Sequence, residues 1–576
     1  MRFLGIFLVL FTVGVLVPAP NTQASSVLRG ETLVLMHGGS QGQWTDVGIA
    51  NPYAAGFSHQ QGNAAWLEPL FYYSAFSGKT IPWLAESYHY NKDFTELTVK
   101  VRHNVYWSDG HPFTAKDVAF TFTMLKKHAP LLRNSAEIRE WVKSIDVLDD
   151  VTLKFVFVSP KPQFHFSHLS FKFDSGVYVV PEHIFKTVDD PLSFSFYDLQ
   201  KGWPVVTGGY QITEWSPQKK VLDYQENWWA VKSGLAKKPK VKRLLFIPFS
   251  DESRAVQMMI NNQIDMSIDL RPTTIKQAVA QNKNIITHTL RESPYGYVDW
   301  WPVSLWFNCS ESPFDNKNVR WAVSYAIDRR QLIDVAYEGA GIPTELPFPD
   351  FSELKPFVDS THDLLKKYPT NEFNSDKSAA LMRQEGYVKD QKGFWAKDGN
   401  RIKMTIHGFS IFDDFAPVLA EQLRKSGFEA TYTAPADSYA KITTGVARVM
   451  IFGHGGSISG PHATLDFFTS KHALPNGQPT QFFSRWKNSE FDAVVNEMGM
   501  LPEREARVKD LYRQAMAIWL DELPNVPLMQ WMHRIPMNTT YWKGYPTVNN
   551  SYINGAFWHL TLPLILQELQ PVQEGS

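Results

Sequence analysis

The stretch from Pro294 to Arg330 constrains the fold of this chain more than any other, and it reads PYGYVDWWPVSLWFNCSESPFDNKNVRWAVSYAIDRR. Its first part combines aromatic with β-branched residues, which favours an extended backbone up to Phe307 that offers flat faces to a ligand. Turn residues around Pro313 then lead into apolar positions with helical spacing, so one face of the following helix belongs to a core. The aromatic residues of the first part are Tyr295, Tyr297, Trp300, Trp301, Trp306 and Phe307. The apolar helix positions are Val319, Ala322, Val323, Ala326 and Ile327.

The end of this stretch and its continuation, SPFDNKNVRWAVSYAIDRRQLIDVAYEGAG at 312–341, resembles a signature of the family 5 extracellular solute-binding proteins. These are the receptors of oligopeptide, dipeptide, nickel and oligosaccharide ABC importers. The resemblance extends over nearly all of the chain after its amino-terminal segment. Other runs that resemble the family are VRHNVYWSDGHPFTAKDVAFTF at 101–122, GWPVVTGGY at 202–210, SDESRAVQMMINNQID at 250–265 and NSDKSAALMRQEG at 374–386.

The resemblance implies an α/β, two-lobed periplasmic-binding-protein fold of type II, the Venus-flytrap arrangement, with an extra subdomain in lobe one. A length of 576 residues also exceeds what one compact core accommodates. We expect lobe I to span 27–290, with the inserted subdomain at about 70–205, and lobe II to span 291–531 before the chain returns to lobe I over 532–576. The hinge candidates are Arg291–Pro294 and Gln530–His533, because short extended crossings absorb backbone rotation. In the subdomain, Thr114 and Asp117 predict a capped helix over Ala115–Lys127.

The amino terminus has the composition of a secretory signal peptide over residues 1–24. Arg2 precedes an apolar run from Phe3 to Val17, and Thr22-Gln23-Ala24 offers a cleavage site with a small residue at its end. This run is shorter than the roughly 20 residues that a membrane-spanning helix needs. The pattern therefore predicts a periplasmic protein. The single Cys309 cannot form an internal disulfide and is expected to be inert.

Composition and motifs exclude several other classes. The 57 basic and 58 acidic residues nearly cancel, which argues against nucleic acid or an anionic membrane surface as a partner. The chain contains no H-E-x-x-H, C-x-x-C or P-loop pattern, so we expect no metal and no cofactor. Ser40 fits the G-x-S-x-G spacing of a hydrolase, but the glycines and proline after it disfavour the helix that such a serine needs. Asp413 and Asp414 could serve acid and base chemistry, although carboxylates ahead of a helix more often cap it.

The loop after the strand ending at Phe452 bears on the identity of the solute. Peptide receptors that this chain resembles hold the ligand's α-amino group with an aspartate in that loop. Here the loop reads GHGGSISGPHATLD, and its first acidic residue is Asp466. A buried ammonium without a carboxylate partner is strongly penalised, whereas an uncharged sugar needs aromatic faces and neutral polar groups. The tail pattern NTTYWKGYPTVNN at 538–550 is similar to chitobiose- and cellobiose-type receptors and also favours an oligosaccharide.

The sequence therefore predicts a non-enzymatic receptor that closes on an oligosaccharide and delivers it to an inner-membrane ABC permease, as a monomer. An oligopeptide or dipeptide remains the alternative solute. A secreted hydrolase using Ser40 or Asp413 is the alternative of another class. Neighbouring strand residues face opposite ways, so only one of Trp300 and Trp301 is expected in a given core. The proposed stacking residues are Trp44, Trp301, Phe412 and Tyr545, and the proposed polar ligand-binding residues are Asp413, His454 and Asn550.

Overall fold

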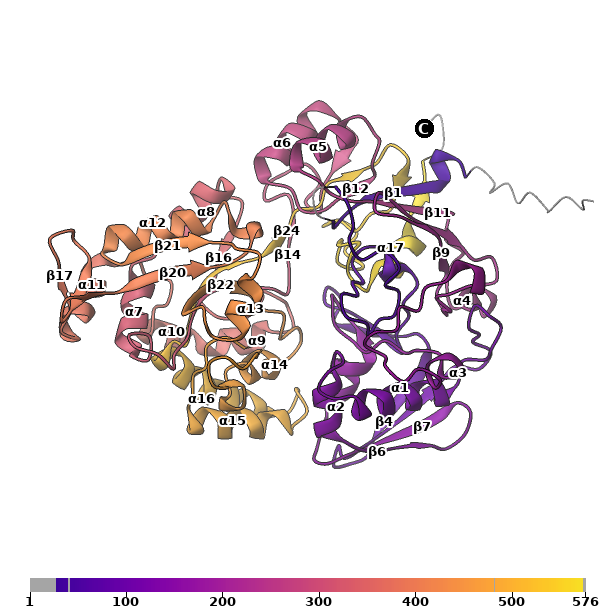
Figure 1. Cartoon of the computed structure of the whole chain (residues 1–576), viewed down its shortest axis with the longest axis horizontal. Helices are drawn as coiled ribbons and strands as arrows, with labels where there is room; N and C mark the ends of the chain where they lie inside the picture. The colour runs from indigo at the N-terminus through magenta and orange to yellow at the C-terminus, as the bar shows by residue number, and fades with distance from the viewer. Residues whose placement is uncertain (1–26, 40–41, 481, 573–576) are drawn as a thin grey trace, which may run out of the picture.

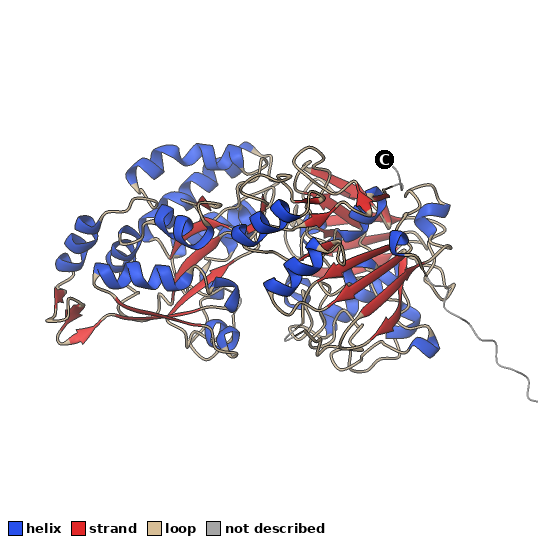
Figure 2. Cartoon of the chain, turned by 90° about the horizontal axis from the view of Figure 1, so that it is seen from above, coloured by secondary structure: helices blue, strands red, loops and turns tan. Residues whose placement is uncertain are grey.

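The structure, a computed structural model, describes residues 27–39, 42–480 and 482–572. These residues form two lobes joined by a narrow crossing (Figure 1). Each lobe contains a β-sheet with helices around it (Figure 2). The segment 1–24, expected to be a signal peptide, and Ser40 lie outside the described residues.

Lobe I is built on a seven-stranded sheet. Its strands in spatial order are β13 (Ile285–Ile286), β25 (Met537–Asn538), β12 (Met266–Ser267), β1 (Thr32–Met36), β11 (Arg243–Ile247), β10 (Lys220–Tyr224) and β9 (Tyr210–Trp215). β1 is parallel to both β11 and β12, so the segments that follow these three strands lie at one edge of the sheet. All five residues of β1 are buried, as expected for a strand covered on both faces. The other elements of this part are α4 (Trp229–Lys232), α5 (Glu252–Ile260), α6 (Pro272–Gln281), α17 (Leu562–Glu568), β26 (Trp542–Lys543) and β27 (Gln570–Pro571).

Two smaller sheets follow β1 in the chain and enlarge lobe I. One contains β3 (Lys79–Pro82), β2 (Phe71–Ser74) and β8 (Ser170–Phe171), and the other contains β4 (Ala85–Tyr90), β5 (Glu96–Val101), β7 (Thr152–Phe157) and β6 (Val142–Val147). Their helices are α1 (Ala115–Lys127), α2 (Ser135–Trp141) and α3 (Glu182–Phe185). The predicted cap of α1 is confirmed: the Thr114 hydroxyl accepts from the Lys116 amide at 3.2 Å, and Asp117 accepts from the Thr114 amide at 2.8 Å.

Lobe II is built on a six-stranded sheet. Its strands in spatial order are β16 (Ile342–Pro343), β23 (Asn525–Gln530), β15 (Val303–Phe307), β22 (Val449–Gly453), β20 (Lys403–His407) and β21 (Glu429–Thr433). Its helices are α7 (Lys317–Tyr325), α8 (Arg329–Tyr337), α9 (Lys355–Val358), α10 (His362–Lys367), α11 (Ser375–Gln384), α12 (Ala416–Ser426), α13 (Ser438–Thr443), α14 (His462–Asp466), α15 (Ser489–Gly499) and α16 (Ala506–Glu522). A small sheet of β17 (Val388–Lys389), β18 (Trp395–Lys397) and β19 (Asn400–Arg401) extends from it.

The signature at 312–341 forms the scaffold of lobe II. Arg320 on α7 is fully buried and donates to the carbonyls of Phe314 at 2.7 Å and Leu523 at 3.1 Å, so it ties the turn before α7 to the end of α16. Arg329 donates to the Pro527 carbonyl in β23 at 2.7 Å. These buried guanidinium groups satisfy backbone acceptors, which explains why the pattern specifies the fold and not the ligand.

The crossing between the lobes differs in detail from the prediction. β14 (Tyr297–Val298) pairs antiparallel with β24 (Met532–His533), and both lie between the lobes in Figure 1. The first hinge candidate, Arg291–Pro294, is bound to lobe I instead, because the Arg291 guanidinium donates to carbonyls there, including that of Lys283 at 2.9 Å. The extended segment up to Phe307 is also interrupted, with Asp299–Pro302 lying between β14 and β15.

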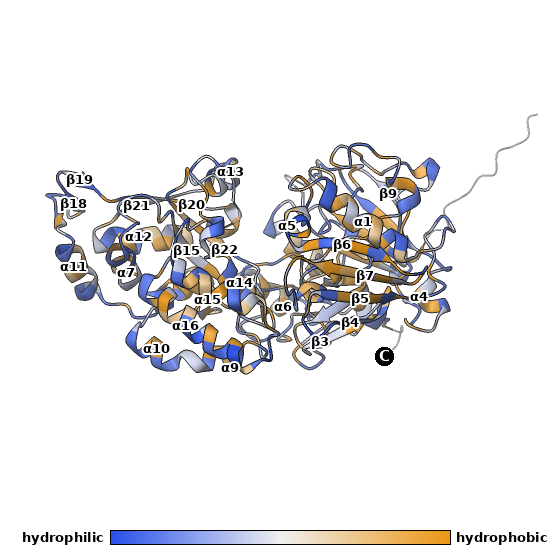
Figure 3. Ribbon diagram, turned by 90° about the horizontal axis from the view of Figure 1, so that it is seen from below, coloured by the Kyte–Doolittle hydropathy of each residue, from blue (hydrophilic) through white to orange (hydrophobic). Residues whose placement is uncertain are grey.

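The buried apolar residues form separate clusters for the two lobes. Figure 3 shows apolar residues along β5 and β7 and hydrophilic residues on outer helices such as α11. Three residues from the lobe I side, Tyr73, Ala75 and Phe173, belong to the lobe II cluster, so the lobes are in apolar contact away from the crossing. No helix among the described residues is both long and apolar enough to cross a membrane.

Candidate ligand-binding site

The carboxyl edge of the lobe II sheet brings several predicted residues together. β20 runs parallel to β21 and β22, so the loops after these strands lie at the same edge. Phe412 and Asp413 follow β20, and His454 follows β22. β15 runs antiparallel to β22 with Val303 opposite Gly453, which places Trp301 at this edge as well. Ligands of open α/β sheets bind at such an edge.

An aromatic cluster covers this edge. Trp301 stacks on Phe412 with ring centroids 5.9 Å apart and planes 6° from parallel, and it meets Phe452 and Trp531 edge to face at 5.1 and 5.9 Å. Phe409 joins through Phe452 at 5.4 Å. Phe412 and Trp531 are buried, whereas Trp301, Phe409 and Phe452 are half-buried and keep part of their surface exposed. We call these five residues the lobe II aromatic wall.

Tryptophan rings lie against the backbone of Gly453, the last residue of β22, and of Gly455 in the loop after it. A Cβ atom on Gly453 would overlap the indole ring of Trp301, and one on Gly455 would lie 2.6 Å from the ring of Trp300. Only glycine permits such close approach of a ring to the main chain. Position 453 therefore cannot carry an aspartate while Trp301 occupies this place.

His454 contributes an uncharged polar group. It is 6% exposed and meets Trp306 and Phe467 edge to face at 5.5 Å each. Burial lowers the pKa of His454 to about 3, so the imidazole is neutral at pH 7. Within the described part of the chain, neither ring nitrogen has a hydrogen-bond partner. A neutral imidazole offers one donor and one acceptor, which matches a hydroxyl group.

The two neighbouring carboxylates have different environments. Asp413 is exposed and accepts from the Tyr432 hydroxyl at 2.9 Å. Asp414 forms an ion pair with the Arg271 guanidinium at 2.8 Å, which links lobe II to the start of α6 in lobe I. The expectation that these carboxylates cap the following helix was wrong, since α12 has no side-chain cap.

Three other predicted residues lie in lobe I, and two of them, Trp44 and Tyr545, belong to its hydrophobic core. Trp44 is 2% exposed and donates from its indole nitrogen to the His37 carbonyl at 3.3 Å. Tyr545 is 3% exposed and donates to the Asn538 carbonyl at 3.2 Å. Neither ring has a free face, so this arrangement does not support stacking by them. Asn550 lies in an exposed turn closed by its amide and the Thr547 carbonyl at 2.8 Å.

Sequence reasoning missed a buried charged cluster at the crossing. His533 on β24 lies with Nδ1 2.6 Å from Asp269 and Nε2 3.4 Å from Asp299. Burial alone would lower the pKa of His533, but the two carboxylates raise it well above its usual value, so the imidazole is charged at neutral pH. His559 and Asp174 lie next to this group, with 3.9 Å between His559 Nε2 and an Asp174 carboxylate oxygen. We call these five residues the hinge cluster. They come from distant parts of the chain, at position 174, between 269 and 299, and between 533 and 559, so no local motif indicates them.

A second missed feature is an aromatic contact between the lobes. Phe173 of lobe I lies between Trp300 and Phe351 of lobe II, with centroid distances of 5.3 and 5.8 Å and planes within 7° of parallel. Trp300 and Trp301 contact different rings, but the expectation that only one of them belongs to a given core was wrong: both pack against the lobe II cluster, and neither lies on a strand. Trp300 is involved in the contact between lobes, and Trp301 in the aromatic wall.

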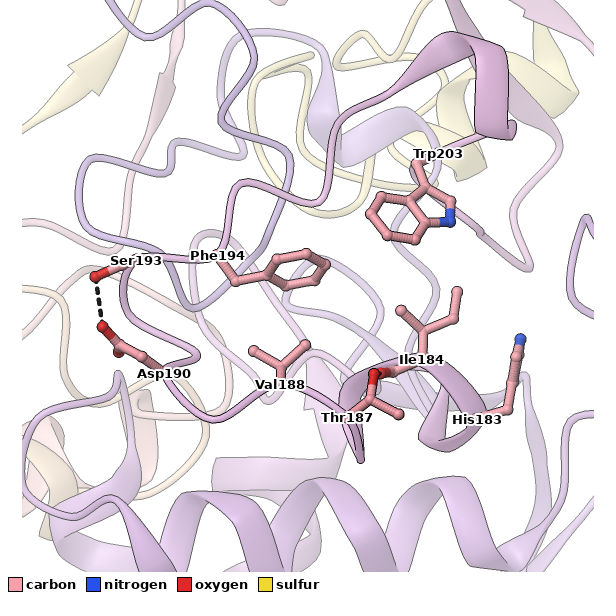
Figure 4. Close-up of a pocket in the computed structure, with 8 residues that line it drawn as sticks. All are labelled: His183, Ile184, Thr187, Val188, Asp190, Ser193, Phe194 and Trp203. Atoms are coloured by element: carbon pink, nitrogen blue, oxygen red, sulfur yellow. Dashed lines mark hydrogen bonds between the residues drawn. The ribbon is translucent and has the colours of Figure 1, made fainter.

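A surface pocket of about 580 Å³ lies apart from both sheet edges, on the enlarged part of lobe I (Figure 4). Apolar side chains dominate its lining, and Asp190 accepts a hydrogen bond from Ser193 at 2.5 Å. None of the predicted ligand-binding residues lines it. The lining residues are His183, Ile184, Thr187, Val188, Asp190, Ser193, Phe194 and Trp203.

Two sheet-based lobes connected by crossing strands define a type II periplasmic-binding-protein fold, and solved structures share it. An oligopeptide ABC transporter periplasmic binding protein of Thermotoga maritima, solved with mannohexaose bound, superposes with a TM-score of 0.79 at 22% identity, covering 95% of this chain and 100% of that one. The profile described as bacterial extracellular solute-binding proteins, family 5 Middle, matches residues 79–475. The chain belongs to this family.

Curated relatives agree with this assignment. Heme-binding protein A of Haemophilus influenzae is 24% identical over 493 residues, covering 81% of each chain. The dipeptide-binding protein of Escherichia coli is 22% identical over 533 residues, covering 87% of this chain and 90% of its own. The predicted family and two-lobed α/β fold are thus confirmed, and the chain is a non-enzymatic substrate-binding protein of an ABC transporter. The secreted-hydrolase alternative has no support.

Proposed function

We propose that this receptor captures a neutral oligosaccharide in the periplasm and delivers it to an inner-membrane ABC permease. The observation that carries the proposal is the uncharged character of the loop after β22. Gly453 is covered by Trp301, and His454 beside it is neutral at pH 7. Sugar C–H faces pack on aromatic rings, and hydroxyl groups pair with neutral donors and acceptors. The related protein of Thermotoga maritima with mannohexaose bound adds support.

In this proposal the half-buried Trp301, Phe409 and Phe452 supply the apolar platform, and His454 pairs with a hydroxyl group. Ligand contacts from both lobes favour the closed form, because only a difference in affinity shifts the populations. Lobe I, over about 27–296 and 534–572, rotates against lobe II, over about 303–530. The strands β14 and β24 carry the rotation.

An oligopeptide is the second candidate, and one observation favours it. Asp413 is exposed at the same edge of the sheet, and its carboxylate could bind the α-amino group of a peptide. The name of the dipeptide-binding relative from Escherichia coli points the same way. The sugar proposal is preferred because Asp413 lies on the exposed surface, where an ion pair contributes only about 0 to 1 kcal/mol.

A thermal-shift screen of the mature chain distinguishes the candidates. The ligands are cello-, chito- and manno-oligosaccharides and di- to pentapeptides. A ligand at about 100 times its dissociation constant stabilises the fold by about 2.7 kcal/mol, which raises the melting temperature measurably. We expect a shift with an oligosaccharide that is recovered intact. A shift with peptides alone would overturn the proposal.

Two variants locate the site. Trp301→Ala and His454→Phe are each expected to weaken oligosaccharide binding by roughly fivefold, because each removes one contact worth about 1 kcal/mol. Tyr545→Phe is the matched control: it removes only the hydroxyl that binds the Asn538 carbonyl in lobe I, and binding should be unchanged. Equal weakening by all three variants would mean that the aromatic wall is not the site.

A further inference from the structure

Three atoms with metal-binding chemistry converge in the hinge cluster. A carboxylate oxygen of Asp299 and one ring nitrogen each of His533 and His559 lie within 4.8 Å of one another, and all three residues are buried. The Asp299 side chain is 4% exposed. Among the described residues, its Oδ1 atom has no hydrogen bond, although His533 Nε2 lies 3.4 Å away as an ion-pair partner. Buried carboxylate oxygens are normally paired more closely, so this position suits a cation.

The remaining nitrogens of the two histidines are already held. His533 Nδ1 lies 2.6 Å from Asp269 Oδ2, and His559 Nδ1 lies 2.8 Å from the Asn554 amide oxygen. Both acceptors fix Nδ1 as the protonated nitrogen, which leaves Nε2 of each ring as the atom available to a metal. Metal-ligating histidines are oriented in this way by a carboxylate or carbonyl on the second ring nitrogen.

We propose that Asp299, His533 and His559 bind one divalent transition-metal ion of zinc-like preference, with Asp174 or water as the fourth ligand. Two imidazoles and a carboxylate suit Zn²⁺, which takes four nitrogen or oxygen ligands in a tetrahedral arrangement. Asp174 lies 3.9 Å from His559 Nε2 and its side chain is 30% exposed, so it also marks a route from solvent.

The position of the site predicts what the ion does. Asp299 follows β14, His533 is on β24, and His559 precedes α17 in lobe I. A bound ion would therefore fasten both crossing strands to lobe I and stabilise the crossing without touching the aromatic wall. The site would therefore be a structural metal site, and its occupancy would not depend on the solute that the receptor carries.

The test is calorimetric titration of the chelator-treated mature chain with Zn²⁺, together with the melting temperature with and without Zn²⁺. We expect one tightly bound ion per chain and a higher melting temperature. His559→Gln and the isosteric Asp299→Asn should each weaken binding by about 100-fold, because each removes a direct ligand and second-shell changes alone weaken binding 10- to 100-fold.

His183→Ala is the matched control. It disrupts the other group of this type among the described residues, Asp109, His111 and His183, which lies at the surface. It should leave the tight ion in place. Failure of the wild-type chain to bind Zn²⁺ more tightly than Asp299→Asn would overturn the proposal, because His533 would then be an imidazolium held by two carboxylates. Loss of the tight ion in His183→Ala would also overturn it. If a variant does not fold, the zinc content of the wild-type chain is measured after loading with Zn²⁺ and dialysis. Less than one bound ion per chain would contradict the proposed site.

Discussion

The lobe II aromatic wall and the hinge cluster differ in the charge of the buried polar side chains next to them. Beside the wall, the buried His454 is neutral at pH 7 and the backbone under Trp301 has no side chain at all, while the carboxylate of Asp413 is exposed. In the hinge cluster, a charged His533 lies between two carboxylates. Buried charges are tolerated where partners are fixed, as at the crossing, and are absent where the partner arrives with the ligand. The difference teaches that the fold keeps its buried charges at the crossing, whereas the buried polar group beside the aromatic wall is neutral.

The largest expected effect on the free energy of unfolding comes from removing the charged His533 of the hinge cluster. His533→Ala leaves the carboxylates of Asp269 and Asp299 facing each other, and Asp299 is 4% exposed. Removal of one partner from a buried ion pair destabilises by about 3 to 5 kcal/mol. Chemical denaturation in the presence of a chelator should show this loss. The double variant Asp299→Asn/His533→Ala should recover part of it, and a loss under about 1 kcal/mol in the single variant would mean that water reaches the carboxylates.

An intermediate effect on the free energy of unfolding is expected from adding a Cβ atom at Gly453, beneath Trp301 of the aromatic wall. Gly453→Ala places a Cβ atom into the ring of Trp301 and should destabilise the chain by about 1 to 3 kcal/mol. Gly341→Ala is a suitable control, because a Cβ atom there would also be crowded, at 2.8 Å from the Ile333 side chain, but would not meet a ring of the wall. A double-mutant cycle with Trp301→Ala should show a coupling of at least about 1 kcal/mol. Additive effects of the two substitutions would mean that the ring does not hold the glycine loop.

The sequence allows the scaffold to be predicted much better than the site. The cap at Thr114 and the signature around Arg320 specify elements through nearby residues or through buried backbone contacts, so their patterns survive in a single sequence. Trp301 and Phe412 could be nominated because aromatic residues near strand ends are conspicuous. Their parallel stack depends on the pairing of β20, β22 and β15, which sequence does not display.

The hinge cluster and the contact of Phe173 were beyond local reasoning for a related reason. Asp269, Asp299 and His533 come from three segments that meet at the crossing between the lobes. Their spacing matches no metal-site motif, so a search for close ligand pairs excludes them. The same limit explains why the burial of Trp44 and Tyr545 was not predicted. The sequence around a lone aromatic residue does not indicate whether it faces a core or a cleft.

The smallest expected effect is on the pH dependence of the melting temperature and comes from Glu503, a half-buried carboxyl group of lobe II outside both the aromatic wall and the hinge cluster. Glu503 is half-buried and accepts from the Ser459 hydroxyl at 3.1 Å; burial raises its pKa from 4.5 to about 7. Since the folded state holds this proton more tightly, the stabilisation is fully present below pH 4.5 and is lost as the pH rises through about 7. Melting temperatures between pH 5 and 8 should fall more steeply for the wild-type chain than for Glu503→Gln. Glu497→Gln, which removes an exposed partner of Arg507 at 2.8 Å, should leave the slope unchanged. Parallel pH profiles for the wild-type chain and Glu503→Gln would place Glu503 among the ordinary solvated carboxylates, and the neutral character of lobe II would then be confined to the aromatic wall.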